Sequence, residues 1–406
     1  MIKRYKRFAE RFIEGILTIS GSITSLAVLL IVVFLFKEGF GLFGNSAVEN
    51  GYVIALNAEN PVRKLTSYEI KEIFDYEIEN WQELGGNDDE IVPFRFEEIF
   101  NYYSEDEMGE NYELLPQRIA EHIAENPNII AFFPEKYVLA DKSELSSSLL
   151  ILHSKNISFA DFFGGREWLP TATPAAQFGV FPLILGTLLV SLFAIIIALP
   201  FGLGAAVYLS ELASERVRSL LKPAIELLAG IPSVVYGFFG LVVLSPLIQK
   251  IFNLPVGETA LTGAVILAIM ALPTIITVSE DAIRTTPRML REASLALGAN
   301  RWQTVYKVVI PYASSGILAA IVLGIGRAVG ETMAVLMVTG NAAVMPTSLF
   351  EPVRTIPATI AAELGEAPTG GTHYQALFML GCILFMITMI VSLSAEMINK
   401  KRRVEH

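Results

Sequence analysis

The chain has 406 residues, of which 53% are hydrophobic and only 17% are charged, and its mean hydropathy is +0.51. Soluble globular chains usually carry about a quarter charged residues, so this composition argues against that class and favours a membrane protein. The net charge of −11 is unevenly spread, because residues 38–177 hold 9 Lys/Arg and 26 Asp/Glu while the remainder is basic.

Six apolar segments are long enough to cross a membrane, which takes about 20 residues. They are residues 16–36, 178–210, 227–249, 259–279, 308–341 and 374–395. Prolines and glycines interrupt the third segment, which a helix bundle tolerates. The first segment exceeds the length of a signal-peptide core, so we interpret it as a retained anchor. The sequence predicts an all-α polytopic membrane protein with six transmembrane helices.

The basic residues predict an orientation in the membrane. With six spans, the basic N-terminus, the loops at 216–222 and 284–307 and the tail at 400–403 all fall on one side. Positively charged loops stay in the cytoplasm, so both termini are expected there and residues 38–175 outside. We expect a multi-pass protein of the bacterial plasma (inner) membrane.

The chain divides into four expected parts. Residues 1–37 form a cytoplasmic N-terminus and the first span, and 38–175 an acidic extracytoplasmic module. Residues 176–400 form a core of five spans with a cytoplasmic loop at about 284–311, and 401–406 a cytoplasmic tail. The module is expected to be an α/β insert, with helices over 65–74 and 112–124 and strands over 91–96 and 129–133. Thr66 or Ser67 is the expected N-cap of its first helix.

Because Cys382 is the chain's only cysteine, no intrachain disulfide is possible, and we expect it to pack in the last span.

The cytoplasmic loop carries the sequence Glu292-Ala293-Ser294, followed by Gly298 and an apolar stretch that ends at Pro311. This pattern resembles the EAA signature of ABC importer permeases, with Ser294 as a small residue in place of alanine. The resemblance implies a coupling helix, a turn at Gly298 and a second helix leading back into the bilayer. Such a coupling helix sits in a cleft on a cytoplasmic ATPase. The alternative is an ordinary amphipathic surface helix.

The chain is not expected to be an enzyme. A P-loop needs Gly followed by Lys to hold phosphates, and no Gly-Lys dipeptide occurs in the sequence. ATP hydrolysis, with its ATP and Mg, must therefore come from a partner, and we expect no cofactor in this chain.

The fifth segment carries two ionisable residues, Arg327 and Glu331, with Thr332 next to them. Ionisable residues at membrane depth are expensive and usually face a pathway. Their i,i+4 spacing predicts an ion pair on one helix face, and Gly326 and Gly330 predict a close helix approach. The pair could simply lock helices together. Alternatively, Arg327, Glu331 and Thr332 line an anion pathway, for which a guanidinium is well suited.

Longer matches extend over about 176–400. They comprise residues 324–341 and 346–350, Gly186-Thr187, Leu199-Pro200 and residues 228–237. Together these closely resemble the PstC-type permease family of bacterial phosphate importers. The resemblance implies the type I ABC importer permease fold, with inorganic phosphate as substrate. It also implies a homologous second permease subunit, an ATPase subunit dimer and a soluble phosphate-binding protein as partners. Membrane lipid surrounds such a subunit, and no nucleic acid is expected.

The external module resembles part of a phosphate-binding protein in residues 65–86 and 125–133. That family's phosphate-ligating Ser-Gly-Thr would follow Arg95, where this chain has Phe96-Glu97-Glu98. Carboxylates at that point would repel a dianion. We therefore expect a docking or structural module that has lost the ligand site and does not bind phosphate on its own.

The chain's four histidines, His122, His153, His373 and His406, do not have the spacing of metal ligands, so no metal site is expected.

Two alternatives remain for the function. One is a permease for another oxyanion, such as molybdate or sulfate. The other is a membrane phosphate sensor or regulator, against which the coupling loop argues.

Overall fold

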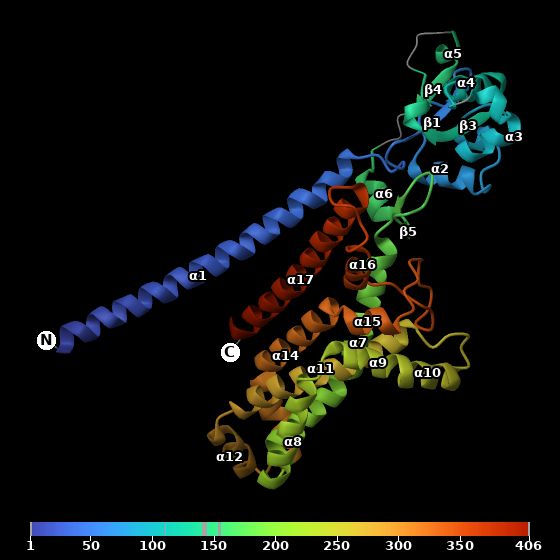
Figure 1. Cartoon of the computed structure of the whole chain (residues 1–406). Coiled ribbons are helices and arrows are strands. Elements are labelled where there is room, and N and C mark those ends of the chain that lie inside the picture. Colours follow the sequence, from blue (N-terminus) through green and yellow to red (C-terminus); the bar gives the residue numbers. More distant parts are fainter. Residues whose placement is uncertain (1, 110, 140–143, 153–155, 405–406) are drawn as a thin grey trace. The chain divides into compact units, whose positions relative to one another are not determined.

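A computed structural model describes residues 2–109, 111–139, 144–152 and 156–404 (Figure 1). The chain forms two compact units, a helical unit of Met1–Phe40 with Pro182–His406 and an acidic module of Gly41–Phe181. The boundaries expected from the sequence lay after residues 37 and 175. The first helix belongs to the same unit as the core helices instead of standing apart.

The helical unit confirms the predicted number of spans. Within the described residues, six helices are long and apolar enough to cross a membrane: Ile13–Gly44, Phe181–Leu212, Ser233–Phe252, Ala260–Arg284, Arg301–Gly330 and Thr372–Ser394. The α-helices of this unit are α1 (Ile2–Phe40), α7 (Phe181–Val207), α8 (Glu215–Ala229), α9 (Ser233–Phe239), α10 (Ser245–Phe252), α11 (Ala260–Arg284), α12 (Arg288–Ala296), α13 (Arg301–Thr304), α14 (Ile310–Gly330), α15 (Met333–Val338), α16 (Ile356–Glu363) and α17 (Thr372–Val404). Five-residue π-helical turns join some of them, at Tyr208–Leu212, Gly240–Leu244 and Val305–Val309.

Helix α1 packs on α17, and the two helices converge at the C-terminal end of α1 (Figure 1). At Gly39 a Cβ atom would lie 3.1 Å from the backbone of Met379 and 3.3 Å from Cys382 Sγ, so the absence of a side chain permits the close approach. The rings of Phe34 and Phe378 meet edge to face at 5.4 Å. Cys382 is a buried, unoxidised cysteine in this contact, as its position in the last span suggested.

Helices α7, α11 and α14 form the core of the unit. A Cβ at Gly202 of α7 would lie 2.7 Å from Ile275, and one at Gly324 of α14 would lie 3.1 Å from the same side chain. Small residues at these two positions let both helices close on α11.

The third and fifth spans differ from the predicted segments. Residues 227–229 belong to the separate helix α8, and the third span begins only at Ser233. The predicted fifth span of 308–341 is wrong as one continuous helix, because α14 ends at Gly330 and α15 begins at Met333. Helix α15 packs on α9, where Gly237 lies against Met337.

The acidic module is an α/β unit, as predicted. Its strands are β1 (Tyr52–Asn57), β2 (Val92–Arg95), β3 (Ile129–Pro134), β4 (Leu149–Leu152), β5 (Trp168–Leu169) and β6 (Gln177–Phe178), and its α-helices are α2 (Ser67–Phe74), α3 (Ile99–Tyr102), α4 (Leu115–Glu125), α5 (Glu144–Ser147) and α6 (Phe159–Gly164). Four strands form a sheet in the order β2-β3-β1-β4, in which only β2 and β3 are parallel, and β5 pairs antiparallel with β6. Thr66 is the N-cap of α2 and forms a capping box with Glu69.

Helices cover both faces of this sheet. Helix α2 packs on one face through Ile70, Ile73 and Phe74, against Ile130 and Phe132 of β3, while α4 packs on the other face. Because β3 is buried on both sides, it reads as an unbroken apolar run instead of an alternating strand.

Candidate functional site

The predicted coupling loop is a helix–turn–helix. Helix α12 contains Glu292, Ala293 and Ser294, and Gly298 follows it with φ of +85°, a conformation that favours glycine. The N–H of Gly298 donates to Leu295 O at 3.0 Å, which closes the helix end. The turn expected at Gly298 is therefore present, and α13 begins three residues later.

Two side chains of α12, Arg291 and Ser294, fix it to the rest of the helical unit. Arg291 Nη2 donates to Glu211 Oε1 at 2.7 Å and to Ile283 O at 3.0 Å. Ser294 Oγ lies 3.0 Å from Thr304 Oγ1, so a hydrogen bond joins α12 to α13. Ser294 is thus more than a small residue in place of alanine. No sequence pattern predicted this partner ten residues away.

The same loop carries large apolar side chains that are exposed on the surface of the chain. Leu297 is 90% exposed, Met289 79% and Trp302 60%, and Glu292 and Ala293 are exposed next to them. Exposed apolar clusters with polar neighbours typically mark protein contacts. Pro311 is exposed in the first turn of α14, where its missing N–H leaves no helix bond unmade.

A buried carboxylate near the end of α11 joins α8 to α11. Glu280 is only 1% exposed, and its carboxylate lies 2.5 Å from Arg218 Nη2, 3.2 Å from Lys222 Nζ and 3.8 Å from Arg284 Nη1. Burial lowers the pKa of Lys222, but its hydrogen bonds and charge interactions with Glu280 and Asp281 outweigh this effect and raise the pKa overall. Sequence reasoning missed this cluster, because the first two cations lie about 60 residues from Glu280 along the chain.

The predicted pair of Arg327 and Glu331 is wrong. Arg327 lies in the last turn of α14, whereas Glu331 follows the helix with an extended backbone. Glu331 Oε1 accepts a hydrogen bond from Ala334 N at 3.4 Å, so this carboxylate caps α15. Among the described residues no ion pair joins the two side chains, because α14 ends between them.

Arg327 lies half-buried one turn before the break between α14 and α15. On α9, the Tyr236 hydroxyl donates to Leu228 O at 2.8 Å. Within the described chain Arg327 has no carboxylate within 4.0 Å. Thr332 Oγ1 donates to Gly330 O at 3.3 Å inside the break itself. Among the described residues, a cationic side chain without a carboxylate partner therefore lies near the end of a helix that is long and apolar enough to span a membrane.

The predicted close approach at Gly326 and Gly330 is not made within the described part of the chain. A Cβ at either glycine would meet no described heavy atom within 4 Å. Gly324 is instead the glycine that packs against α11. The face of α14 with Gly326 and Gly330 is open.

The residues Gly186 and Thr187 hold the loop between α15 and α16 on α7. A Cβ at Gly186 would collide with Arg354 O, and Thr187 Oγ1 accepts from Ile356 N at 2.9 Å. Next to them, the Glu363 carboxylate bridges Arg354 Nη1 at 2.7 Å and His373 Nε2 at 2.9 Å. The glycine and threonine that the sequence singled out therefore hold the α15–α16 loop against α7.

In the acidic module, Arg95 is engaged internally. Its guanidinium lies over the Phe74 ring at 5.1 Å, and Nη2 is 3.5 Å from Phe74 O. A 3₁₀ turn, Phe96–Glu98, stands where the resemblance would place the phosphate-ligating residues. That the module binds no phosphate stays a prediction.

A metal site has no support in the described part of the chain, where no group of three or more His, Cys, Asp or Glu side chains could hold an ion. His122 is buried among the rings of Phe94, Tyr102 and Tyr103. His373 pairs with Glu363, while His153 and His406 lie outside the described residues.

Comparison with known proteins identifies the family. Residues 198–404 match the model of the binding-protein-dependent transport system inner membrane component. A Bacillus subtilis protein named "Probable ABC transporter permease protein YqgH" is 39% identical over 248 residues, covering 61% of this chain and 80% of that protein. The "Phosphate transport system permease protein PstC" of Mesorhizobium japonicum is 41% identical over 249 residues, covering 57% of this chain and 75% of that protein.

Solved structures show weaker likeness. The MetNI methionine ABC transporter in an inward-facing conformation matches with 21% identity and a TM-score of 0.42, over 55% of this chain and 94% of that chain. An ABC-type phosphate transport receptor from Vibrio cholerae matches with 20% identity and a TM-score of 0.20, over 28% of this chain and 50% of that chain. At that score, the resemblance of the acidic module to a phosphate-binding protein stays a prediction.

The matched region begins in α7 and extends to the end of α17, and so includes the coupling loop, the break after α14 and Arg327. The six membrane-spanning helices agree with a multi-pass transport subunit. The chain belongs to the family of inner-membrane components of binding-protein-dependent transport systems, the permease subunits of ABC importers.

Proposed function

We propose that this chain is the PstC-type permease subunit of an ATP-driven importer of inorganic phosphate. The observation that carries the proposal is Arg327, a half-buried guanidinium without a carboxylate partner in the described chain, next to a helix break. A guanidinium stays charged and its fork of donors matches phosphate oxygens. The names of the PstC relatives support the same substrate.

The break after α14 supports a role in transport. In membrane transporters, discontinuous helices with free backbone groups surround substrate sites near the middle of the bilayer. Thr332 lies in the break, and Glu331 caps the helix that follows it. In this proposal Arg327 attracts the anion, Thr332 offers a hydroxyl, and Glu331 holds α15 in place and limits the positive field.

The coupling loop supports a cytoplasmic ATPase dimer as partner. Glu292, Ala293, Ser294 and Gly298 would seat α12 in a cleft on that ATPase, and Pro311 starts the helix that carries the motion to Arg327. The ATPase would bind ATP and Mg. Both termini are then cytoplasmic and the acidic module lies outside, where a soluble phosphate-binding protein would deliver the substrate.

The open faces of the helical unit support a second permease subunit and lipid as neighbours. Leu323 on α14 and Phe238 on α9 are exposed, although both lie in membrane-spanning helices. The open face at Gly326 and Gly330 would let a helix of a homologous permease approach closely. The pathway would then form between two subunits, each supplying half.

Uptake by the complete complex in lipid vesicles tests the substrate. With ATP inside and binding protein outside, we expect labelled phosphate to accumulate and unlabelled phosphate to compete. Excess molybdate or sulfate should leave uptake unchanged. Competition by either oxyanion as strong as that by phosphate would contradict the proposed substrate.

Reversing a charge in the loop tests the coupling. Glu292→Lys should abolish uptake and ATPase co-purification while membrane insertion stays normal, because the reversed charge would unseat α12. Glu215→Lys, at an exposed carboxylate in the first turn of α8, is the matched control and should retain most uptake. Equal uptake by both variants would refute the coupling role.

A further inference from the structure

The short helix α6 of the acidic module carries two exposed aromatic rings on one side. Phe159 and Phe163 are four residues apart, which places them on the same face of the helix. They are 52% and 40% exposed, and their rings lie parallel with centroids 6.5 Å apart. We call these two side chains the aromatic face of α6.

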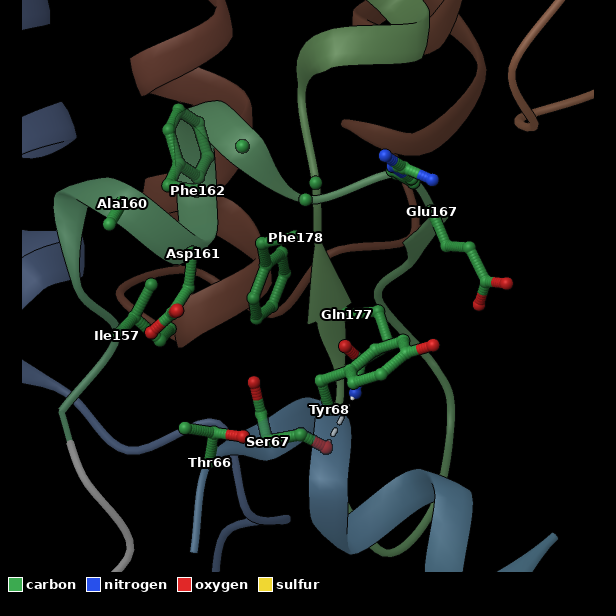
Figure 2. A pocket seen from close by; sticks show the side chains of 14 residues that line it. Thr66, Ser67, Tyr68, Ile157, Ala160, Asp161, Phe162, Glu167, Gln177 and Phe178 are labelled. Carbon is green, nitrogen blue, oxygen red and sulfur yellow. Dashed lines mark hydrogen bonds between the residues drawn. The ribbon is translucent and has the colours of Figure 1, made fainter. Parts of the chain in front are cut away.

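The opposite side of α6 is polar. Asp161, the one charged residue in the helix, points toward Ser67 of α2 across a cavity of about 540 Å³ (Figure 2). Ser158 Oγ accepts from Asp161 N at 3.1 Å and donates to the Asp161 carboxylate at 2.8 Å, so the first turn of the helix is capped. Helix α6 is therefore amphipathic, with its aromatic and polar sides turned away from each other.

The chain before α6 is tied to the end of the first span. The helical stretch that is apolar enough to cross a membrane extends to Gly44. The next residue, Asn45, accepts a hydrogen bond on its carbonyl oxygen from Ile157 N at 3.0 Å. The ring of Phe43, still within that stretch, stacks on the ring of Phe159 with centroids 3.8 Å apart. The aromatic face therefore begins beside the last residues of a span.

The other end of α6 is tied to the start of the second span. Helix α7 begins at Phe181, and the residue before it, Val180, donates its N–H to Phe162 O at 2.9 Å. A Cβ at Gly165 would lie 2.7 Å from the Cα of Gly179, so the two backbones touch where α6 ends. Helix α6 is thus held between the point where the chain leaves one span and the point where it enters the next.

These two ties indicate what covers the aromatic face. Residues that adjoin a span lie at the boundary between hydrocarbon and water, so a helix bonded to two such points lies there too. Amphipathic helices with phenylalanine on one face and charge on the other lie in this boundary, with the apolar face toward the acyl chains. Phe40 at the end of α1 and Phe181 at the start of α7 are also exposed, at 49% and 44%.

We propose that the aromatic face of α6 inserts into the lipid headgroup–acyl boundary of the leaflet at which α1 ends, and so holds the acidic module on the membrane surface. The two rings leave water there, while Asp161 stays on the side that faces the module. The module holds 9 Lys/Arg against 25 Asp/Glu, a balance of −16, so anionic headgroups would repel it and the attraction must be apolar. A zwitterionic bilayer is therefore sufficient. The inference does not depend on which substrate the helical unit transports.

Spin-label accessibility on the full chain in phosphatidylcholine nanodiscs tests the contact. Cys382→Ala removes the only native cysteine, and Phe159→Cys, Phe163→Cys or Asp161→Cys then carries a single nitroxide. Oxygen concentrates in lipid, whereas a nickel chelate stays in water. Collisions with oxygen should therefore dominate at Phe159→Cys and Phe163→Cys, and collisions with nickel at Asp161→Cys.

Phe100→Cys is the matched control for these labels. Phe100 is a 48% exposed phenylalanine of the same module, on α3, which lies away from α6 (Figure 1). Its label should collide mainly with nickel. Nickel-dominated collisions at both Phe159→Cys and Phe163→Cys would show that water covers the aromatic face. Protection of both labels from oxygen and nickel alike would show that protein covers it, and either result would overturn the proposal.

Photocrosslinking tests the same contact without changing any side chain. Phosphatidylcholine with a diazirine near the top of one acyl chain is irradiated in nanodiscs that hold the parent protein, and mass spectrometry locates the modified peptides. We expect modification within residues 158–166 and none within residues 99–103. Modification of α1 shows that the lipid has reacted. Modification of α1 without any within residues 158–166 would overturn the proposal.

Discussion

The buried Glu280 offers the sharpest test of how the helical unit is held together. Its carboxylate contacts Arg218, Lys222 and Arg284 and is almost inaccessible to water. The substitution Glu280→Gln preserves the shape and one acceptor oxygen but removes the negative charge. Three cations then surround a neutral group, and they repel one another.

Breaking a buried ion pair typically destabilises a protein by about 3–5 kcal/mol. Because Lys222 and Arg284 are partly exposed and can turn to solvent, we expect about 3 kcal/mol here. For a domain of this size that corresponds to a fall in Tm of roughly 6–12 °C. Thermal unfolding of the purified protein in one detergent measures the shift.

The neighbouring Asp281 supplies the control. Its side chain is 63% exposed, and Lys222, at 3.4 Å, is its one ion-pair partner among the described residues, so Asp281→Asn should cost about 0.5 kcal/mol or less. Adding Arg218→Met to Glu280→Gln should recover part of the loss, since it removes one cation that would otherwise stay unpaired. Equal shifts for Glu280→Gln and Asp281→Asn would refute the reasoning.

Three further changes test other parts of the structure. The proline in Gly298→Pro cannot adopt a φ of +85° and has no N–H to donate to Leu295 O. Uptake should therefore stop while membrane insertion is unchanged. Normal uptake by this variant would contradict the role of the turn. Ser294→Ala should retain uptake but increase the rate of amide hydrogen exchange in α12 about fivefold, because the variant loses a hydrogen bond to Thr304 worth about 1 kcal/mol. An unchanged exchange rate would show that this hydrogen bond does not stabilise α12. Burial lowers the pKa of His122, so the unfolded module takes up the proton first and stability falls as the pH drops below about 6.5. In His122→Phe, the stability of α4, measured by hydrogen exchange, should depend less on pH. An equally steep pH dependence in this variant would show that His122 is not its cause.

Features set by local sequence were predictable. Hydropathy gave six spans, and the Thr66–Glu69 capping pattern located the start of α2. The break after α14 was not predictable, because the apolar run continues through α15 and hydropathy cannot report a change of direction. The predicted ion pair between Arg327 and Glu331 was wrong for that reason, because α14 ends before Glu331. A spacing of four places two side chains on one face only while the helix lasts.

Contacts between distant residues were also beyond sequence reasoning. The partners Arg218 and Glu280 are 62 residues apart, and their spacing carries no periodic signal. The hydrogen bonds that tie α6 to the ends of two spans likewise join parts of the chain that no local pattern connects. In contrast, the EAA resemblance implied the turn at Gly298, and the structure has a positive φ there, a conformation that favours glycine.

In the proposed mechanism phosphate passes Arg327, and uptake by the Arg327→Gln complex tests this step most directly. Since Arg327 has no carboxylate partner in the described chain, the variant should assemble and melt like the parent protein. Loss of a charged donor to the anion should reduce uptake by about 10- to 100-fold, and Arg327→Lys should be impaired too. Arg216→Gln makes the same substitution at an exposed arginine of α8; it is the matched control and should keep most of the uptake. Phosphate uptake near the parent rate in a normally assembled Arg327→Gln complex would show that Arg327 does not serve the phosphate pathway.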